Sequence, residues 1–158
     1  MIRTRKRKLK HTTRRKLTGC PFTGACNCNE ATRHSIRYIV VHTTATKPDM
    51  PLSGLDKLPF HFIITKGGKL LNLRPVNSTD GTIEVALLGG LNFEGNHVDD
   101  RTSYQNETLF NTLVLLSERF PDARIKGADR LYVYPYANPG FNVQQWLGEF
   151  LPPFLMAA

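Results

Sequence analysis

Three cysteines lie within nine residues of one another, at Cys20, Cys26 and Cys28. Thiolates are soft donors that hold zinc in tetrahedral sites, so these residues, with His11 or His34 as a fourth ligand, could form a structural zinc site. Their C-x5-C-x-C spacing differs from the closely paired ligands of zinc ribbons. An odd number of cysteines also does not fit a disulfide framework. We therefore favour reduced thiols over zinc as the interpretation of this cluster.

The N-terminus is a second segment with a distinct chemistry, because it is strongly basic. Residues 1–29 carry nine Lys or Arg and no acid, whereas the rest of the 158-residue chain carries twelve basic and thirteen acidic residues, so the formal charge of +8 comes from this segment. A segment so poor in apolar residues cannot fold alone, and we expect it to stay disordered until a polyanionic partner orders it. Nucleic acid or an acidic face of an assembly is the expected partner, and a tail that only aids solubility is the alternative. The residues predicted to bind nucleic acid are Arg3, Arg5, Lys6, Arg7, Lys8, Lys10, Arg14, Arg15 and Lys16.

The hydrophobic pattern of the remainder predicts strands and two helices. Apolar, β-branched runs predict strands at 37–42 and 82–88, a hairpin of 60–65 and 69–73 around a glycine turn, and a short strand at 124–126. A long helix is expected to begin after Thr102, with Gln105 completing a capping box, and to end at Pro121. Its core-facing stripe is Leu109, Leu113, Leu116 and Phe120. With a second helix at 143–150, these elements predict an α/β fold, a mixed central β-sheet flanked by helices.

We divide the chain into four parts. These are a basic tail at 1–18, a cysteine-containing connector at 19–35, a folded domain at 36–150 and an apolar C-terminal tail at 151–158. No stretch approaches the roughly 20 apolar residues of a membrane span, and no signal-peptide pattern follows the basic N-terminus. We therefore expect no membrane span and no secretion by a signal peptide, but a virion or the cytoplasm of a bacterial host.

Several motifs of the folded domain occur in an order that resembles a known family. They are Ile39-Val40-Val41-His42-Thr43-Thr44-Ala45-Thr46, Phe60-His61-Phe62-Ile63-Ile64, Leu73-Arg74-Pro75, Leu87-Leu88-Gly89-Gly90-Leu91, Asp100-Arg101-Thr102, Phe120-Pro121-Asp122-Ala123-Arg124-Ile125 and Asn138-Pro139-Gly140-Phe141-Asn142-Val143. Together they resemble the zinc-dependent N-acetylmuramoyl-L-alanine amidases of the phage-lysozyme and peptidoglycan-recognition-protein type. The resemblance covers residues 36 to 147 and implies the amidase fold for the predicted domain.

The resemblance also implies three zinc ligands, of which this chain keeps one. The first ligand position falls on His42, which is retained. The second falls on Ala128, which has no donor atom, and the third on Asn138, whose amide oxygen is a poor zinc ligand. The tyrosine that assists the reaction in the family is Phe60 here, and the final aspartate is Asn142. We therefore expect no catalytic residues and no cofactor at this site.

These substitutions predict a degenerate amidase rather than an enzyme. We expect a structural or binding module, phage-encoded and associated with a virion or nucleoprotein through its basic tail, with other virion proteins as further partners. The alternative is an active peptidoglycan amidase with a rearranged zinc site, in which His61 and Asp129 join His42. Tyr132, Tyr134 and Tyr136 lie in the loop that flanks the former site and are predicted either to pack on the domain or to contact a protein partner.

Overall fold

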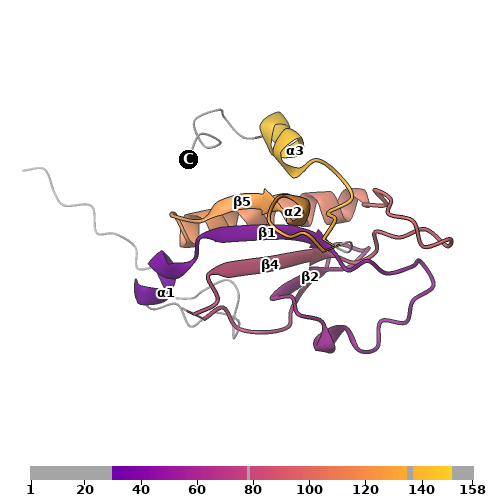
Figure 1. Ribbon diagram of the computed structural model, residues 1–158, viewed down its shortest axis with the longest axis horizontal. Coiled ribbons are helices and arrows are strands. Elements are labelled where there is room, and N and C mark those ends of the chain that lie inside the picture. The colour runs from indigo at the N-terminus through magenta and orange to yellow at the C-terminus, as the bar shows by residue number, and fades with distance from the viewer. Residues whose placement is uncertain (1–29, 78, 135–136, 151–158) are drawn as a thin grey trace, which may run out of the picture.

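The computed structural model describes residues 30–77, 79–134 and 137–150, and these ranges form one mixed sheet with helices packed on it (Figure 1). The strand order is β3-β2-β4-β1-β5, in which β2, β4, β1 and β5 are parallel and β3 is antiparallel to β2. The elements are α1 (Glu30–Ser35), β1 (Tyr38–Thr43), the 3-10 turn η1 (Leu55–Lys57), β2 (Phe62–Ile64), β3 (Leu70–Asn72), β4 (Thr82–Leu87), α2 (Ser103–Arg119), β5 (Arg124–Gly127), the 3-10 turn η2 (Ala128–Arg130) and α3 (Val143–Phe150). The predicted α/β class is thereby confirmed.

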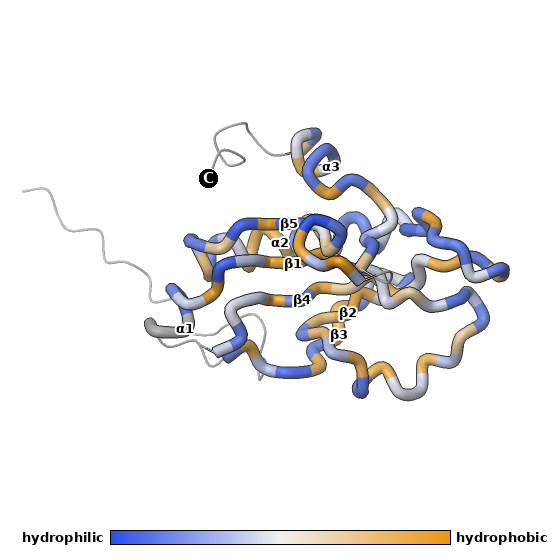
Figure 2. Tube along the Cα trace, viewed as in Figure 1, coloured by the Kyte–Doolittle hydropathy of each residue, from blue (hydrophilic) through white to orange (hydrophobic). Residues whose placement is uncertain are grey.

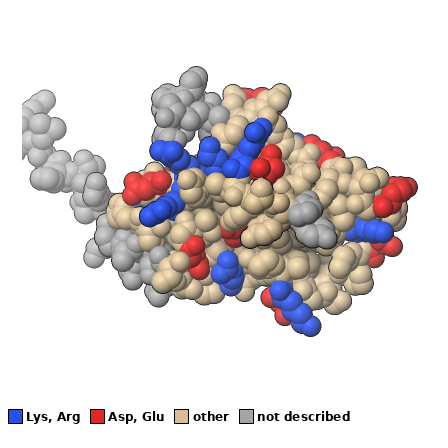
Figure 3. Space-filling model, viewed as in Figure 1, with Lys and Arg blue, Asp and Glu red and all other residues tan. Residues whose placement is uncertain are grey.

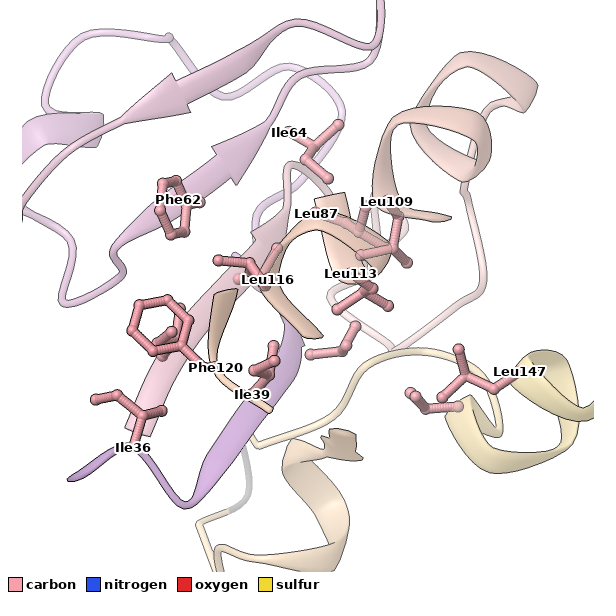
Figure 4. Close-up of a cluster of buried hydrophobic side chains, with 14 of the residues drawn as sticks. Ile36, Ile39, Phe62, Ile64, Leu87, Leu109, Leu113, Leu116, Phe120 and Leu147 are labelled. Atoms are coloured by element: carbon pink, nitrogen blue, oxygen red, sulfur yellow. The ribbon is translucent and has the colours of Figure 1, made fainter. Parts of the chain in front are cut away.

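The main hydrophobic core lies between the sheet and helices α2 and α3. Alternate residues of the central strands, such as Ile39 in β1 and Val85 in β4, are fully buried against it. Helix α2 contributes the predicted stripe, of which Leu113 is one member, and α3 contributes Leu147 (Figure 4). Trp146 of α3 belongs to the same core. Burying each side chain of this size stabilises the fold by about 1.5–3 kcal/mol. This core therefore holds one face of the sheet rigidly.

The opposite face of the sheet is covered more thinly. Its small apolar cluster contains Val40, Ala128 and Ala137, with Tyr132 packed at the side. Figure 2 shows apolar segments concentrated in the strands and polar segments in the connecting loops. Because side chains alternate along a strand, the residues of β1 that do not enter the main core face this second side.

Helix α2 begins with the capping box that the sequence predicted. The hydroxyl of Thr102 accepts from the backbone N–H of Gln105 at 3.1 Å, and the Gln105 side chain accepts from the N–H of Thr102 at 3.1 Å. Gln105 is fully buried, and its amide also donates to the carbonyls of Ile64 at 3.1 Å and Leu88 at 3.0 Å. One side chain therefore ties the start of α2 to the ends of β2 and β4.

The structure differs from the sequence prediction at the connector and at the hairpin. The last six residues of the expected connector form helix α1, and His34 there is hydrogen-bonded to Asp122 at 2.6 Å. The run lacks Gly and Pro, and its last turn carries Arg33 and His34, which suit a helix C-terminus. The hairpin is present, but its strands are only three residues each, shorter than expected.

Helices within the described ranges are too short or too polar to cross a lipid bilayer.

Candidate functional site

The candidate site lies on the thinly covered face of the sheet, where polar side chains of three adjacent strands meet. His42 lies near the end of β1, and His61 directly precedes β2. Glu84 lies in β4, the strand between β1 and β2. All three residues are buried, with exposed fractions of 8% for His42, 8% for Glu84 and 0% for His61. Buried polar groups are costly unless they are hydrogen-bonded, so their partners define what the site can do.

Glu84 is the centre of the first group of contacts. One carboxylate oxygen accepts a hydrogen bond from Nε2 of His42. The other accepts from the hydroxyl of Thr82 at 2.6 Å and from the hydroxyl of Tyr132 at 2.7 Å. The ring of His42 also lies 5.8 Å from that of Tyr132 in a stacked arrangement and 5.1 Å from the ring of Phe60. The side chain that occupies the first zinc position is thus held by a carboxylate and two aromatic rings.

These contacts shift the pKa values of two groups. Burial alone would raise the pKa of Glu84, but the hydrogen bonds from His42, Thr82 and Tyr132 outweigh it and lower the pKa. Burial, together with the hydrogen bond to Glu84, raises the pKa of Tyr132 to about 12. Glu84 is therefore ionised and Tyr132 is protonated at neutral pH, so the tyrosine acts as a hydrogen-bond donor to a carboxylate.

A second group of contacts surrounds His61. Its Nδ1 accepts from the backbone N–H of Glu84 at 2.9 Å, and its Nε2 lies 3.0 Å from a carboxylate oxygen of Asp80. Asp80 also accepts from the backbone N–H of Asn77 at 2.7 Å and lies 3.6 Å from Arg74. Both ring nitrogens of His61 are therefore engaged in holding the loop before β4 against β2.

The pKa values of this second group are both lowered. Burial is the largest cause for His61, and it outweighs the hydrogen bond to Asp80, which acts in the opposite direction. For Asp80, burial acts to raise the pKa, but the hydrogen bonds from Asn77 and His61 and the nearby charges lower it. At neutral pH the pair is therefore a neutral imidazole that donates to an ionised carboxylate.

The residues at the three implied zinc positions do not fit the metal. Ala128 is fully buried in the small apolar cluster with Val40. The side-chain oxygen of Asn138 accepts from the N–H of Gly140 at 2.8 Å, so it stabilises its own loop. His42 directs Nε2 to Glu84. One histidine with an alanine and an engaged amide does not supply the nitrogen, sulfur or carboxylate donors that a catalytic zinc site needs.

Two further residues of the predicted site, Asn142 and Asp129, make contacts within their own segments. The side chain of Asn142 accepts from the backbone N–H of Gln145 at 3.0 Å, in the first turn of α3. Asp129, which the alternative prediction placed on the metal, lies beside Arg130 at 3.5 Å on η2 and is exposed. Across residues 30–77, 79–134 and 137–150, no three His, Cys, Asp or Glu side chains are grouped so that they could hold a metal ion.

The structure describes two of the three tyrosines of the loop after η2, Tyr132 and Tyr134, whose rings lie 5.8 Å apart. Tyr132 packs on its own domain through Glu84 and His42, whereas Tyr134 has 67% of its surface exposed. Tyr136 lies outside the described residues, and so do Cys20, Cys26, Cys28 and the basic residues from Arg3 to Lys16. The predicted roles of these residues stay predictions.

Sequence reasoning did not identify Glu84, Thr82 or Asp80 as members of the site. The run Thr82–Leu87 was interpreted as a buried apolar strand, yet it contains one carboxylate at its third position. A charged residue within such a strand must be paired, because an isolated buried charge is costly. That single residue is the signal from which a polar network on this face could have been inferred.

Comparison with solved structures identifies the fold. The chain is similar to the Ph2119 endolysin of the Thermus scotoductus MAT2119 bacteriophage, with a TM-score of 0.57 and 18% identity over 72% of this chain and 83% of that one. It is also similar to the N-acetylmuramoyl-L-alanine amidases LysCS and LysC from Clostridium intestinale URNW. Each has a TM-score of 0.55 and 17% identity over 75% of this chain, covering 85% of LysCS and 87% of LysC. No protein-family model and no curated protein sequence matches the chain.

Proposed function

We propose that this chain, which has the fold of phage and bacterial N-acetylmuramoyl-L-alanine amidases, is a catalytically degenerate member that serves as a structural or binding module. Its basic N-terminal segment attaches it to nucleic acid or to a nucleoprotein assembly, since nine cations without an acid favour a polyanionic partner. A phage origin is in keeping with the phage endolysin among the similar structures, and a place in the virion is part of the same proposal. A shared fold alone does not carry an activity, so the proposal depends on the site.

One observation carries the proposal, the hydrogen bond between His42 and Glu84. It engages Nε2 of the one retained ligand position, and the carboxylate on the other side is itself bonded to Thr82 and Tyr132. The remaining two ligand positions offer no free donor, because Ala128 has none and the side-chain oxygen of Asn138 is bonded to Gly140. Among the described residues, the three ligand positions therefore offer at most one free donor, Nδ1 of His42, which is fewer than the three protein ligands of a catalytic zinc site.

The test is the zinc content and the muropeptide release of the full chain in which Cys20, Cys26 and Cys28 are replaced by Ser. Removing the thiols means that any bound zinc reports on the amidase site. We expect far less than one zinc per chain by elemental analysis and no soluble muropeptides from purified peptidoglycan. A matched variant, His42→Ala in the same background, should give the same result.

The alternative, an active amidase with a rearranged zinc site, predicts the opposite outcome. It requires about one zinc per chain that is lost in His42→Ala, together with release of muropeptides that a chelator abolishes. That result would overturn the degenerate assignment. Zinc that is bound only when the three cysteines are present would instead assign the metal to the N-terminal cluster and leave the proposal standing.

A further inference from the structure

The edge strand β5 carries basic side chains on the thinly covered side of the sheet. Ile125 packs against the main core, so its neighbours Arg124 and Lys126 point to the other side. The backbone of Arg37, directly before β1, lies beside the start of β5, because the backbone N–H of Arg124 donates to the Arg37 carbonyl at 2.8 Å. Figure 3 shows Lys and Arg side chains gathered over β5, with a few Asp or Glu side chains at the border of the group. We call Arg37, Arg124 and Lys126 the basic edge.

The cations of the basic edge form no ion pair within the described part of the chain. Elsewhere on the domain, Lys66 lies 2.7 Å from Asp100, and Arg101 lies 2.8 Å from Asp99. Among the residues that the structure describes, no carboxylate forms an ion pair with a member of the basic edge. From Glu30 onward the chain has twelve basic and thirteen acidic residues, so this positive strip arises from where the cations are placed. Such a strip attracts polyanions from solution.

The basic edge lies at the end of the sheet where the N-terminal segment joins the domain. Helix α1 directly precedes Arg37 and β1, and His34 in α1 is bonded to Asp122 just before β5. Figure 1 shows α1 at the end of the sheet where β5 begins. The nine cations of residues 1–29 are therefore connected to the domain next to the basic edge, not at the far edge formed by β3.

We propose that the basic edge extends the polyanion-binding surface of the N-terminal segment onto the folded domain, and that it contacts the phosphate backbone of nucleic acid. The inference rests on the proposed binding function and adds a second, folded contact to it. Side chains two residues apart on a strand are separated by about 6.6 Å, and duplex DNA carries about one charge per 1.7 Å of its axis, so Arg124 and Lys126 can contact separate phosphates. Charges on an edge strand also prevent pairing with other sheets, and the test separates that role from binding.

The test compares two double variants of the full chain, Arg124→Gln/Lys126→Gln and the matched control Lys57→Gln/Lys69→Gln. Both remove two positive charges, and Lys57 and Lys69 are exposed residues outside the basic edge. The measurement is the binding constant for a short fluorescein-labelled DNA duplex, by fluorescence anisotropy, over a series of salt concentrations. The slope of log K against log salt is negative, and each lost phosphate contact lowers its magnitude by about 0.9, so we expect the magnitude to decrease by about 1.8 in the edge variant and not at all in the control.

The remaining outcomes would each overturn the inference. Equal slopes in all three proteins, or equal decreases in both variants, would show that the basic edge makes no phosphate contact of its own. If the edge variant self-associates and its slope is unchanged, the charges serve to prevent β5 from pairing with another sheet. Stronger competition by wall teichoic acid than by unlabelled duplex at equal phosphate concentration would show that the basic edge binds a cell-wall polymer and not nucleic acid. Absence of binding by the unmodified chain would overturn the proposed function as well.

Discussion

Glu84 and His42 are joined side chain to side chain across neighbouring parallel strands, on the face of the sheet away from α2. Each side chain is only 11% exposed. A buried carboxylate of this kind is held by its partners, and removing it leaves those partners without an acceptor. The pair is therefore a structural element of the site, and its loss should be measurable as a loss of stability.

Replacing Glu84 with Ala should destabilise the domain by about 3–5 kcal/mol, because the polar groups of His42, Thr82 and Tyr132 lose their shared acceptor in a buried position. The free energy of unfolding from urea titration measures this. Tyr132→Phe removes one donor and should cost about 1.5–3 kcal/mol.

The matched control for these variants is Glu107→Ala, at an exposed position of α2. It should change the free energy of unfolding by less than about 0.5 kcal/mol. Equal effects of Glu84→Ala and Glu107→Ala would show that the Glu84 contacts contribute nothing to the folded state.

Acidification should weaken the domain in two stages. The pKa of His61 is lowered from 6.5 on folding, so below about pH 6.5 the unfolded chain binds more protons than the folded one, and stability falls as the pH decreases. A second loss follows below about pH 4.5. Folding also lowers the pKa values of Glu84 and Asp80, so the unfolded chain again binds more protons than the folded one. The free energy of unfolding measured from pH 7.5 to about pH 2.5 tests both stages.

The first stage is assigned to His61 by geometry as well as by its pKa. Its Nδ1 accepts the N–H of Glu84, which requires that this nitrogen carry no proton. In His61→Asn the fall in stability between pH 6.5 and pH 5 should be smaller than in the unmodified chain. An unchanged pH profile would assign that stage to another group.

The side chain of Gln105 should be essential to the attachment of α2. Gln105→Leu removes the donor to the carbonyls of Ile64 and Leu88, and it also breaks the capping box with Thr102. We expect a loss of about 2–4 kcal/mol in the free energy of unfolding, from buried unsatisfied carbonyls and the weakened cap.

Thr102→Ala serves as the comparison, since it removes the cap hydroxyl and leaves the Gln105 contacts to the strands in place. Its cost should be about 1 kcal/mol. If both variants lose the same amount, the contacts of Gln105 with β2 and β4 add nothing to the cap.

Removing residues 1–18 should abolish most of the salt-dependent binding to nucleic acid. The deletion takes away nine cations, and the magnitude of the negative slope of log K against log salt should decrease by several units for duplex DNA. A second variant keeps the full length of the chain and replaces those nine residues with Gln. Full binding by either protein would contradict the proposed role of the N-terminal segment.

The fold was predictable because its signals are local and strong. The β-branched runs of β1 and β4 and the leucine stripe of α2 each specify one element, and Thr102 with Gln105 marks where the helix begins. Helix α1 was missed because six residues carry too little periodicity to distinguish a helix from a connector. Its position depends on contacts such as that between His34 and Asp122, which lie 88 residues apart in the sequence.

The site was predictable only in part, because its polar contacts join distant segments. His42 could be singled out from its place at the end of a strand, and the absence of a donor at Ala128 is plain from the sequence. The pairing of His42 with Glu84, and of His61 with Asp80, depends on strand order and loop packing, which no local pattern encodes. Glu84 was recognisable as an anomaly in its strand but not as the partner of a particular histidine.

The sheet order also determines when β1 can pair with its neighbours during synthesis on the ribosome. Strand β1 ends at Thr43, yet its two partners are β4, which ends at Leu87, and β5, which ends at Gly127. At about 5–20 residues per second, roughly 4 to 17 s pass between completion of β1 and completion of its second partner. During that interval an apolar strand has an unpaired edge, which is a site for association with other nascent chains or with chaperones. A chain truncated before Arg124 would keep that edge permanently open.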